Sequence, residues 1–170
     1  MIHFSATRTI EEIFDIFHRG PLPVSSHYAI DDDGTVYALV PESKRAWHAG
    51  RSSFEGRPDV NSRSVGIELR NGGCLTPAGD GTRFRTVLGR LFSPPNGVRR
   101  SRSRWWESYA EPQMSALTEL CRDIAARHNI PPERFVGHSD VALPAGRKID
   151  PGPLFDWDRL RREGAPTVNG

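Results

Sequence analysis

The segment Ser64-Val65-Gly66-Ile67-Glu68-Leu69 indicates a buried strand near the middle of the chain. Its apolar residues Val65, Ile67 and Leu69 alternate with small or polar neighbours, which is the period-two pattern of a β-strand. Glu68 is the one charged residue inside this apolar pattern. A buried carboxylate is unfavourable unless it has a partner. We therefore treat Glu68 as a candidate functional residue.

Further strands are expected on both sides of this segment. Residues Ile2 to Ser5 form a short strand candidate next to the N-terminus. Residues 24–30 and 35–40 are two more, and Asp31-Asp32-Asp33-Gly34 joins them. An Asp-Gly pair between apolar runs is a typical hairpin turn. Residues 136–138 are a last short candidate.

Three segments predict helices. Residues 10–18 place apolar side chains at helical spacing and should form an amphipathic helix. Pro112 can open a second helix, whose apolar stripe continues to about His128. Residues 157–163 are expected to form a short third helix. Strands interleaved with helices favour the α/β class, here a single domain with a central mixed β-sheet flanked by α-helices.

The 170 residues suit one compact domain. We place it at residues 1–163, followed by a flexible C-terminal tail at 164–170. Residues 46–63 are expected to form an irregular loop. The strongest Gly and Pro signals fall between residues 72 and 111. They predict a loop-rich insertion at about 74–110, in which residues 84–91 can pair as a hairpin.

The composition is that of an ordinary soluble protein, with 36% hydrophobic and 26% charged residues. No apolar run of about 18 residues is present, so no transmembrane helix is expected. The first residues lack a charged region followed by an apolar one, so we expect no secretory signal and a start in the cytoplasm. Cys74 and Cys121 are at no metal-ligand spacing, and Cys121 is predicted to be a core residue.

The net charge of +2 is unevenly distributed. Seven arginines fall within 22 positions that contain no acidic residue: Arg83, Arg85, Arg90, Arg99, Arg100, Arg102 and Arg104. Such a region can bind nucleic acid or an anionic polymer, or can simply face solvent. The sequence alone leaves these three alternatives open.

Histidines outside the helices are candidate functional residues, because functional groups concentrate in loops and at strand ends. They are His3, His27, His48 and His138. After His138 a Pro- and Gly-rich loop carries Lys148 and Asp150 two positions apart. If that stretch is extended, both side chains point to the same side.

These motifs resemble the type 2 N-acetylmuramoyl-L-alanine amidase family, which includes phage endolysins, muropeptide-recycling amidases and peptidoglycan recognition proteins. The resemblance covers nearly the whole chain except residues 74–110, and its motifs occur in family order. The six matching stretches are Ile2–Thr7, Val24–Ile30, Asp33–Tyr37, Ala46–Gly50, Ser64–Leu69 and Gly137-His138 through Lys148–Pro153.

The resemblance implies one zinc ion held by His3, His138 and Asp150, a ligand set that leaves a fourth position for water. It makes Glu68 the general base and Lys148 the cation that stabilises the oxyanion. The implied reaction cuts the bond between the lactyl group of N-acetylmuramic acid and L-alanine. Residues expected to contact the substrate are His27, Tyr28, Trp47, His48 and Asn71.

Three functions remain open. The first is an endolysin-like wall hydrolase, which would act on the cell wall after release or assisted export. The second is a cytosolic amidase that recycles anhydro-muropeptides, and the third is a peptidoglycan-binding or regulatory module without catalysis. The expected partner is peptidoglycan or a muropeptide. We expect no nucleic-acid partner, and we expect the protein to be a monomer.

Overall fold

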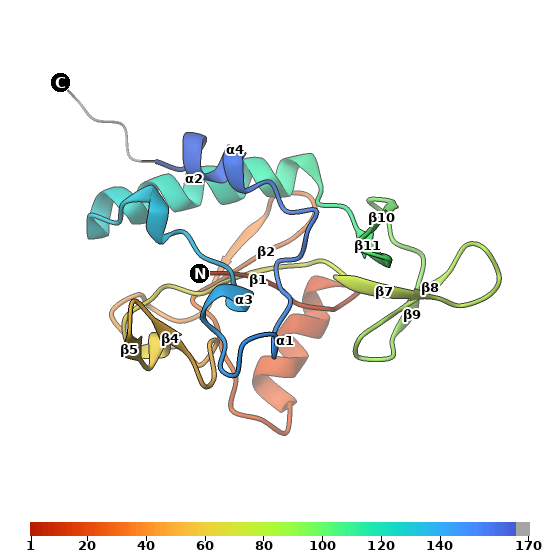
Figure 1. Ribbon diagram of the computed structural model, residues 1–170, viewed down its shortest axis with the longest axis horizontal. Helices are drawn as coiled ribbons and strands as arrows, with labels where there is room; N and C mark the ends of the chain where they lie inside the picture. Colours follow the sequence, from red (N-terminus) through yellow and green to blue (C-terminus); the bar gives the residue numbers. More distant parts are fainter. Residues whose placement is uncertain (166–170) are drawn as a thin grey trace.

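The computed structural model describes residues 1–165 as an α/β fold around a four-stranded mixed sheet (Figure 1). The strand order is β1-β6-β2-β3. β6 pairs in parallel with both β1 and β2, whereas β3 pairs antiparallel with β2. The fold class expected from the sequence is therefore confirmed. The strands are β1 (Ile2–Phe4), β2 (Tyr28–Ile30), β3 (Val36–Ala38) and β6 (Ile67–Leu69).

The alternation of side chains along β1 and β6 separates the core from the polar face of the sheet. Ile2, Ile67 and Leu69 belong to the main hydrophobic core. Successive residues of a strand point to opposite faces, so His3 and Glu68 lie on the other side. The two residues are also direct partners in the parallel pairing of β1 with β6. The sheet thus presents a histidine and a carboxylate together.

Helices cover both faces of the sheet (Figure 1). α2 (Glu111–His128) and α4 (Trp157–Glu163) lie on the core side, where Cys121 is buried as predicted. α2 has Pro112 in its first turn, and the left-handed Asn129 terminates it. α1 (Ile10–Arg19) lies on the opposite side, where Ile10 and Ile13 pack against Ala29 of β2. All three helices lie within a residue or two of their predicted positions.

The predicted insertion contains more regular structure than its sequence indicates. It forms a second, antiparallel sheet with the order β10-β11-β7-β8-β9. The expected hairpin at 84–91 corresponds to the pairing of β8 with β9. The strands are β7 (Cys74–Pro77), β8 (Phe84–Thr86), β9 (Leu91–Phe92), β10 (Val98–Ser101) and β11 (Arg104–Glu107).

A buried ion pair joins the two sheets. Arg70 directly follows β6, and its guanidinium contacts both carboxylate oxygens of Glu107 at 3.0 Å. Both side chains are almost fully buried, and Asp32 gives Arg70 a second carboxylate partner. A buried charge is tolerated only when it is paired. The Arg70–Glu107 ion pair therefore holds the insertion against the central sheet at the end of β6.

Two local predictions were wrong. Residues 136–138 contribute only a single bridge, between Ile2 and Gly137, and His138 instead begins α3 (His138–Val141). The region 46–63, expected to be irregular, contains a small hairpin and a 3₁₀ turn. These elements are β4 (Ser53–Phe54), β5 (Arg57–Pro58) and η1 (Val60–Ser62), and a second 3₁₀ turn, η2 (Pro132–Arg134), follows α2.

The expected flexible tail at 164–170 falls largely outside the described residues, which end at 165. Gly164 belongs to the fold, since its amide donates to the carbonyl of Leu160 at the end of α4. Among the helices within residues 1–165, none is long and apolar enough to cross a bilayer.

The Arg70–Glu107 pair generates a stability prediction. Glu107→Ala leaves a buried guanidinium with Asp32 as its one remaining carboxylate partner, and should lower the free energy of unfolding by about 3 kcal/mol. Urea denaturation measures this change. Glu133→Ala, at an exposed position in η2, is the control and should change stability by less than about 0.5 kcal/mol. Equal stability of the two variants would show that the pair does not hold the sheets together.

Candidate metal centre

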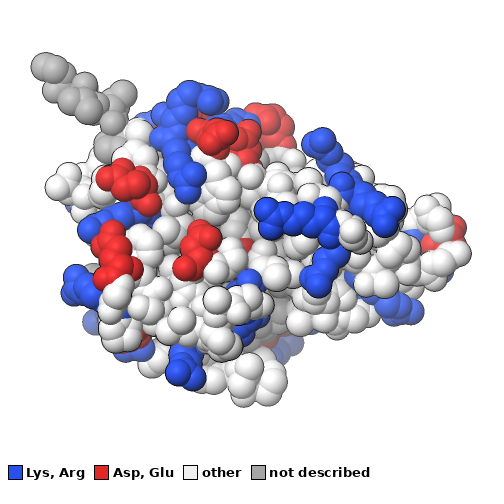
Figure 2. Space-filling model, in the orientation of Figure 1, with Lys and Arg blue, Asp and Glu red and all other residues white. Residues whose placement is uncertain are grey.

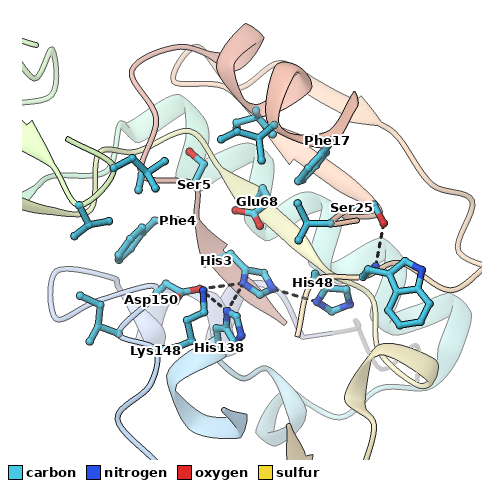
Figure 3. Close-up of a pocket in the computed structure, with 18 of the residues that line it drawn as sticks. His3, Phe4, Ser5, Phe17, Ser25, His48, Glu68, His138, Lys148 and Asp150 are labelled. Carbon is cyan, nitrogen blue, oxygen red and sulfur yellow. Dashed lines mark hydrogen bonds and ion pairs between the residues drawn. The ribbon is translucent and has the colours of Figure 1, made fainter. Parts of the chain in front are cut away.

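Three side chains from distant parts of the chain converge on one point (Figure 3). His3 comes from β1, His138 from the start of α3 and Asp150 from the loop after it. The Nδ1 atoms of the two histidines are 3.1 Å apart, and Asp150 Oδ2 lies 2.9 Å from His3 Nδ1 and 3.1 Å from His138 Nδ1. All three residues are buried. The structure thus brings together the three residues expected to be metal ligands.

The hydrogen bond of His138 Nε2 determines which ring nitrogen carries the proton and which has a lone pair available for a metal ion. His138 Nε2 lies 3.0 Å from the carbonyl oxygen of Ala49, which can only accept a hydrogen bond. Nε2 must therefore carry the proton. In the neutral ring the Nδ1 lone pair then points into the cluster, as a metal ligand requires.

A longer relay orients His3. Ser64 Oγ donates to the carbonyl of Val60 at 2.7 Å, so it accepts from His48 Nε2 at 3.3 Å. His48 Nδ1 is then an acceptor, and His3 Nε2 donates to it at 3.1 Å. This assignment follows from the network of partners. It leaves the Nδ1 lone pair of His3 directed at the cluster.

The chemistry of this donor set fits a zinc ion. Two neutral imidazoles and one carboxylate are ligands found in catalytic zinc sites with an open position. Tetrahedral bonds of about 2.0–2.1 Å place ligand atoms roughly 3.3 Å apart, close to the spacing of 2.9–3.1 Å between the three donor atoms.

The electrostatics of the cluster agree with this interpretation. Burial lowers the pKa of His3 to about 4, although Asp150 opposes the effect, so the ring is neutral at pH 7. Burial alone would raise the pKa of Asp150, but its close contacts with both histidines keep it well below its usual range. The neutral His3 ring beside an ionised carboxylate favours the binding of a cation.

A pocket of about 420 Å³ contains this cluster, and both Glu68 and Lys148 line it (Figure 3). Burial and the negative charge of Asp150 raise the pKa of Glu68 to about 8, against the opposing effect of Lys148. A carboxylate with a raised pKa can exchange protons near neutral pH. The pocket therefore combines a possible metal site with a proton-transfer group and a cation.

The residues expected to contact substrate divide into two groups. Trp47 and His48 line the pocket, and the Trp47 side chain is exposed. His27, Tyr28 and Asn71 are not among its lining residues, because other contacts hold them elsewhere. His27 lies between the amide of Gly66 and the carbonyl of Lys44, Tyr28 donates to Glu42, and Asn71 Nδ2 donates to Ser108. These contacts indicate a structural role for the three residues.

Other residues of the site were missed in the sequence. Val87 and Leu88, in the turn between β8 and β9, line the pocket and are exposed. The ion pair of Arg90 with Glu12 of α1 holds this turn in place. Ser64, which orients His48, was also missed. No local pattern signals these roles, since each depends on contacts between residues far apart in the sequence.

Comparisons with known proteins give one consistent result. The sequence profile of the N-acetylmuramoyl-L-alanine amidase family matches residues 1–153. The chain is 36% identical over 148 residues to the N-acetylmuramoyl-L-alanine amidase AmiD of Escherichia coli K12, a match that covers 83% of this chain and 45% of AmiD. It is 35% identical over 140 residues to the 1,6-anhydro-N-acetylmuramyl-L-alanine amidase AmpD of the same organism, covering 82% of this chain and 58% of AmpD. The chain therefore spans about half the length of these relatives.

The solved structure of E. coli AmiD is also similar to this fold. It aligns with a TM-score of 0.73 and 30% sequence identity, covering 98% of this chain and 56% of that one. The match includes residues 74–110, which the sequence motifs left out.

The orienting relay generates a prediction about metal affinity. His48→Ala removes the acceptor of His3 Nε2, and loss of such a partner typically weakens metal binding by about 10–100-fold. Competition with a chromophoric chelator measures the zinc affinity of each variant. His18→Ala, at the exposed end of α1, is the matched control and should bind zinc as the unaltered protein does. Unchanged affinity in His48→Ala would remove the relay from this account.

Proposed function

Since the chain belongs to the N-acetylmuramoyl-L-alanine amidase family, we propose that it is a zinc-dependent hydrolase of muropeptides. The bond cut is the amide between the lactyl group of N-acetylmuramic acid and L-alanine. The observation that carries the proposal is the convergence of His3, His138 and Asp150 in the pocket that Glu68 and Lys148 also line.

His3, His138 and Asp150 would hold the zinc ion. When bound, zinc polarises the scissile carbonyl and lowers the pKa of water to about 7. Glu68 takes a proton from the water molecule while the water oxygen forms a bond to the lactyl carbonyl carbon. Lys148 stabilises the negative charge that develops on the carbonyl oxygen.

The same proton completes the reaction. Glu68 delivers it to the L-alanine nitrogen as the C–N bond breaks. The products are a lactyl carboxylate on the sugar and a peptide with a free amino group. Glu68 is placed for both transfers, because it lines the same pocket as the three candidate ligands and Lys148.

We expect the substrate to be a soluble anhydro-muropeptide. AmiD of E. coli has been solved with anhydro-N-acetylmuramic acid-L-Ala-D-γ-Glu-L-Lys as its substrate. AmpDh3 of Pseudomonas aeruginosa, with a TM-score of 0.71 and 29% identity over 97% of this chain and 58% of that one, has been solved with an anhydromuramic pentapeptide. These relatives favour the recycling alternative over the endolysin-like function preferred from the sequence alone.

A non-catalytic binding module is the remaining alternative. Such a protein would have no need for a complete set of candidate ligands together with Glu68 and Lys148. Turnover of a defined muropeptide separates this alternative from the amidase.

The first activity prediction concerns Glu68. The zinc-loaded protein should release a tripeptide that begins with L-alanine from anhydro-N-acetylmuramic acid-L-Ala-D-γ-Glu-L-Lys, as detected by mass spectrometry. Glu68→Gln keeps the shape of the side chain but cannot take the proton, so kcat/KM should fall by at least about 100-fold. Its zinc content should not change. Full activity in this variant would exclude Glu68 as the base, and Glu133→Gln serves as the surface control.

The second activity prediction concerns the form of the substrate. Equal molar amounts of muropeptide are offered as soluble anhydro-muropeptide and as intact sacculi, and the released peptides are quantified. We expect faster release from the soluble fragment. Faster release from sacculi would instead support the endolysin-like function.

A further inference from the structure

A second groove, of about 660 Å³, lies beside the metal pocket and shares Lys148 and Ile149 with it. One wall is the β10–β11 hairpin, through Arg102, Arg104 and Trp106. The other wall is formed by residues that follow Asp150. The two cavities therefore form one continuous surface, with Lys148 at the junction.

The two arginines of this groove have no charged partner in the part of the chain that the structure describes. Within residues 1–165, Arg102 and Arg104 form no ion pair and donate no side-chain hydrogen bond, although most other arginines do one or the other. Both are exposed. Figure 2 shows a group of Lys and Arg side chains over this end of the molecule. A groove with two free guanidinium groups is complementary to an anion.

The backbone of the hairpin adds a second observation. Arg102 and Ser103 are the two central residues of its turn, and both have positive φ angles, 48° and 65°. A two-residue turn with both φ angles positive favours Asn and Gly, which tolerate this conformation. An arginine there is unfavourable for the turn. Within the described residues Arg102 forms no ion pair and no side-chain hydrogen bond that would offset this cost, so a ligand is the simplest reason for its presence.

We propose that this groove binds a carboxylate of the peptide part of the substrate. The inference rests on the function proposed above. In a γ-linked glutamate, such as that of the peptide L-Ala-D-γ-Glu-L-Lys, the α-carboxylate is free. With the scissile bond in the metal pocket, the peptide extends past Lys148 into the groove. Arg102 and Arg104 then receive the carboxylate through charge-assisted hydrogen bonds.

Two substrates that differ in one group test the proposal. The first is N-acetylmuramoyl-L-Ala-γ-D-Glu-L-Lys with a free α-carboxylate on its glutamate, and the second carries an amide there. We expect the unaltered protein to cleave the free acid with about tenfold higher kcat/KM, which corresponds to about 1.4 kcal/mol. Arg102→Gln/Arg104→Gln should abolish this preference. Equal kcat/KM for both substrates with the unaltered protein would overturn the proposal.

The matched control is Arg99→Gln/Arg100→Gln. It removes the same charge from the same hairpin at two exposed positions that do not line the groove, and it should retain the preference. If both double variants lose the preference equally, the effect is one of general charge and the proposal fails. A second contrary result is that Arg102→Gln/Arg104→Gln loses activity on sacculi alone and keeps it on the soluble substrate. That result would show that the two arginines bind neighbouring peptides of the wall, and it would overturn the proposal.

Binding of the product separates this proposal from the proposed function. Calorimetry with the tripeptide L-Ala-γ-D-Glu-L-Lys and its amidated form requires no turnover. We expect about tenfold weaker binding of the amidated form, and no such difference in Arg102→Gln/Arg104→Gln. A protein without amidase activity that shows this difference would refute the function but keep the groove. An active enzyme that binds both peptides equally would refute the groove alone.

Discussion

The parallel pairing of β1 with β6 is the constraint on which the candidate site depends. Its register places His3 directly beside Glu68. The alternation of each strand sends Ile2, Ile67 and Leu69 into the core under α2. A shift of one residue would exchange these two sets of side chains. It would place a carboxylate and an imidazole in the core and isoleucines in the pocket, so burial of the core and assembly of the site require the same register.

The other residues of the site come from segments that are distant from β1 and β6 in the sequence or precede β6. The loop that begins at α3 brings His138 and Asp150 to His3, and the region before β6 supplies His48 and Ser64. In both histidines, the hydrogen bond of Nε2 sets the direction of the ligand atom Nδ1. Charge also limits the arrangement, because Asp150 and Glu68 are close enough for one to raise the pKa of the other. A cation at the cluster would relieve that repulsion.

Much of this fold could be predicted from the sequence, since period-two and helical spacing depend on local residues. The central strands and the three helices follow from such patterns. Apart from the β8–β9 hairpin, the strands of the insertion could not be found in this way. They are short, and they depend on pairing with one another and on the Arg70–Glu107 contact. His138 was misplaced on a strand because a local contact, from the amide of Gly137 to Asp140, starts a helix there. The candidate ligands were found by family resemblance, whereas the relay through His48 required the structure.

The proposed zinc site consists of His3, His138 and Asp150. X-ray absorption spectroscopy at the zinc edge of the purified, zinc-loaded protein tests it most directly, because imidazole rings give a distinct scattering signal that can be counted. We predict one zinc per chain, bound by two imidazoles with oxygen in the remaining positions. A protein that binds no zinc at equimolar concentration, or a spectrum with fewer than two imidazoles, would contradict it.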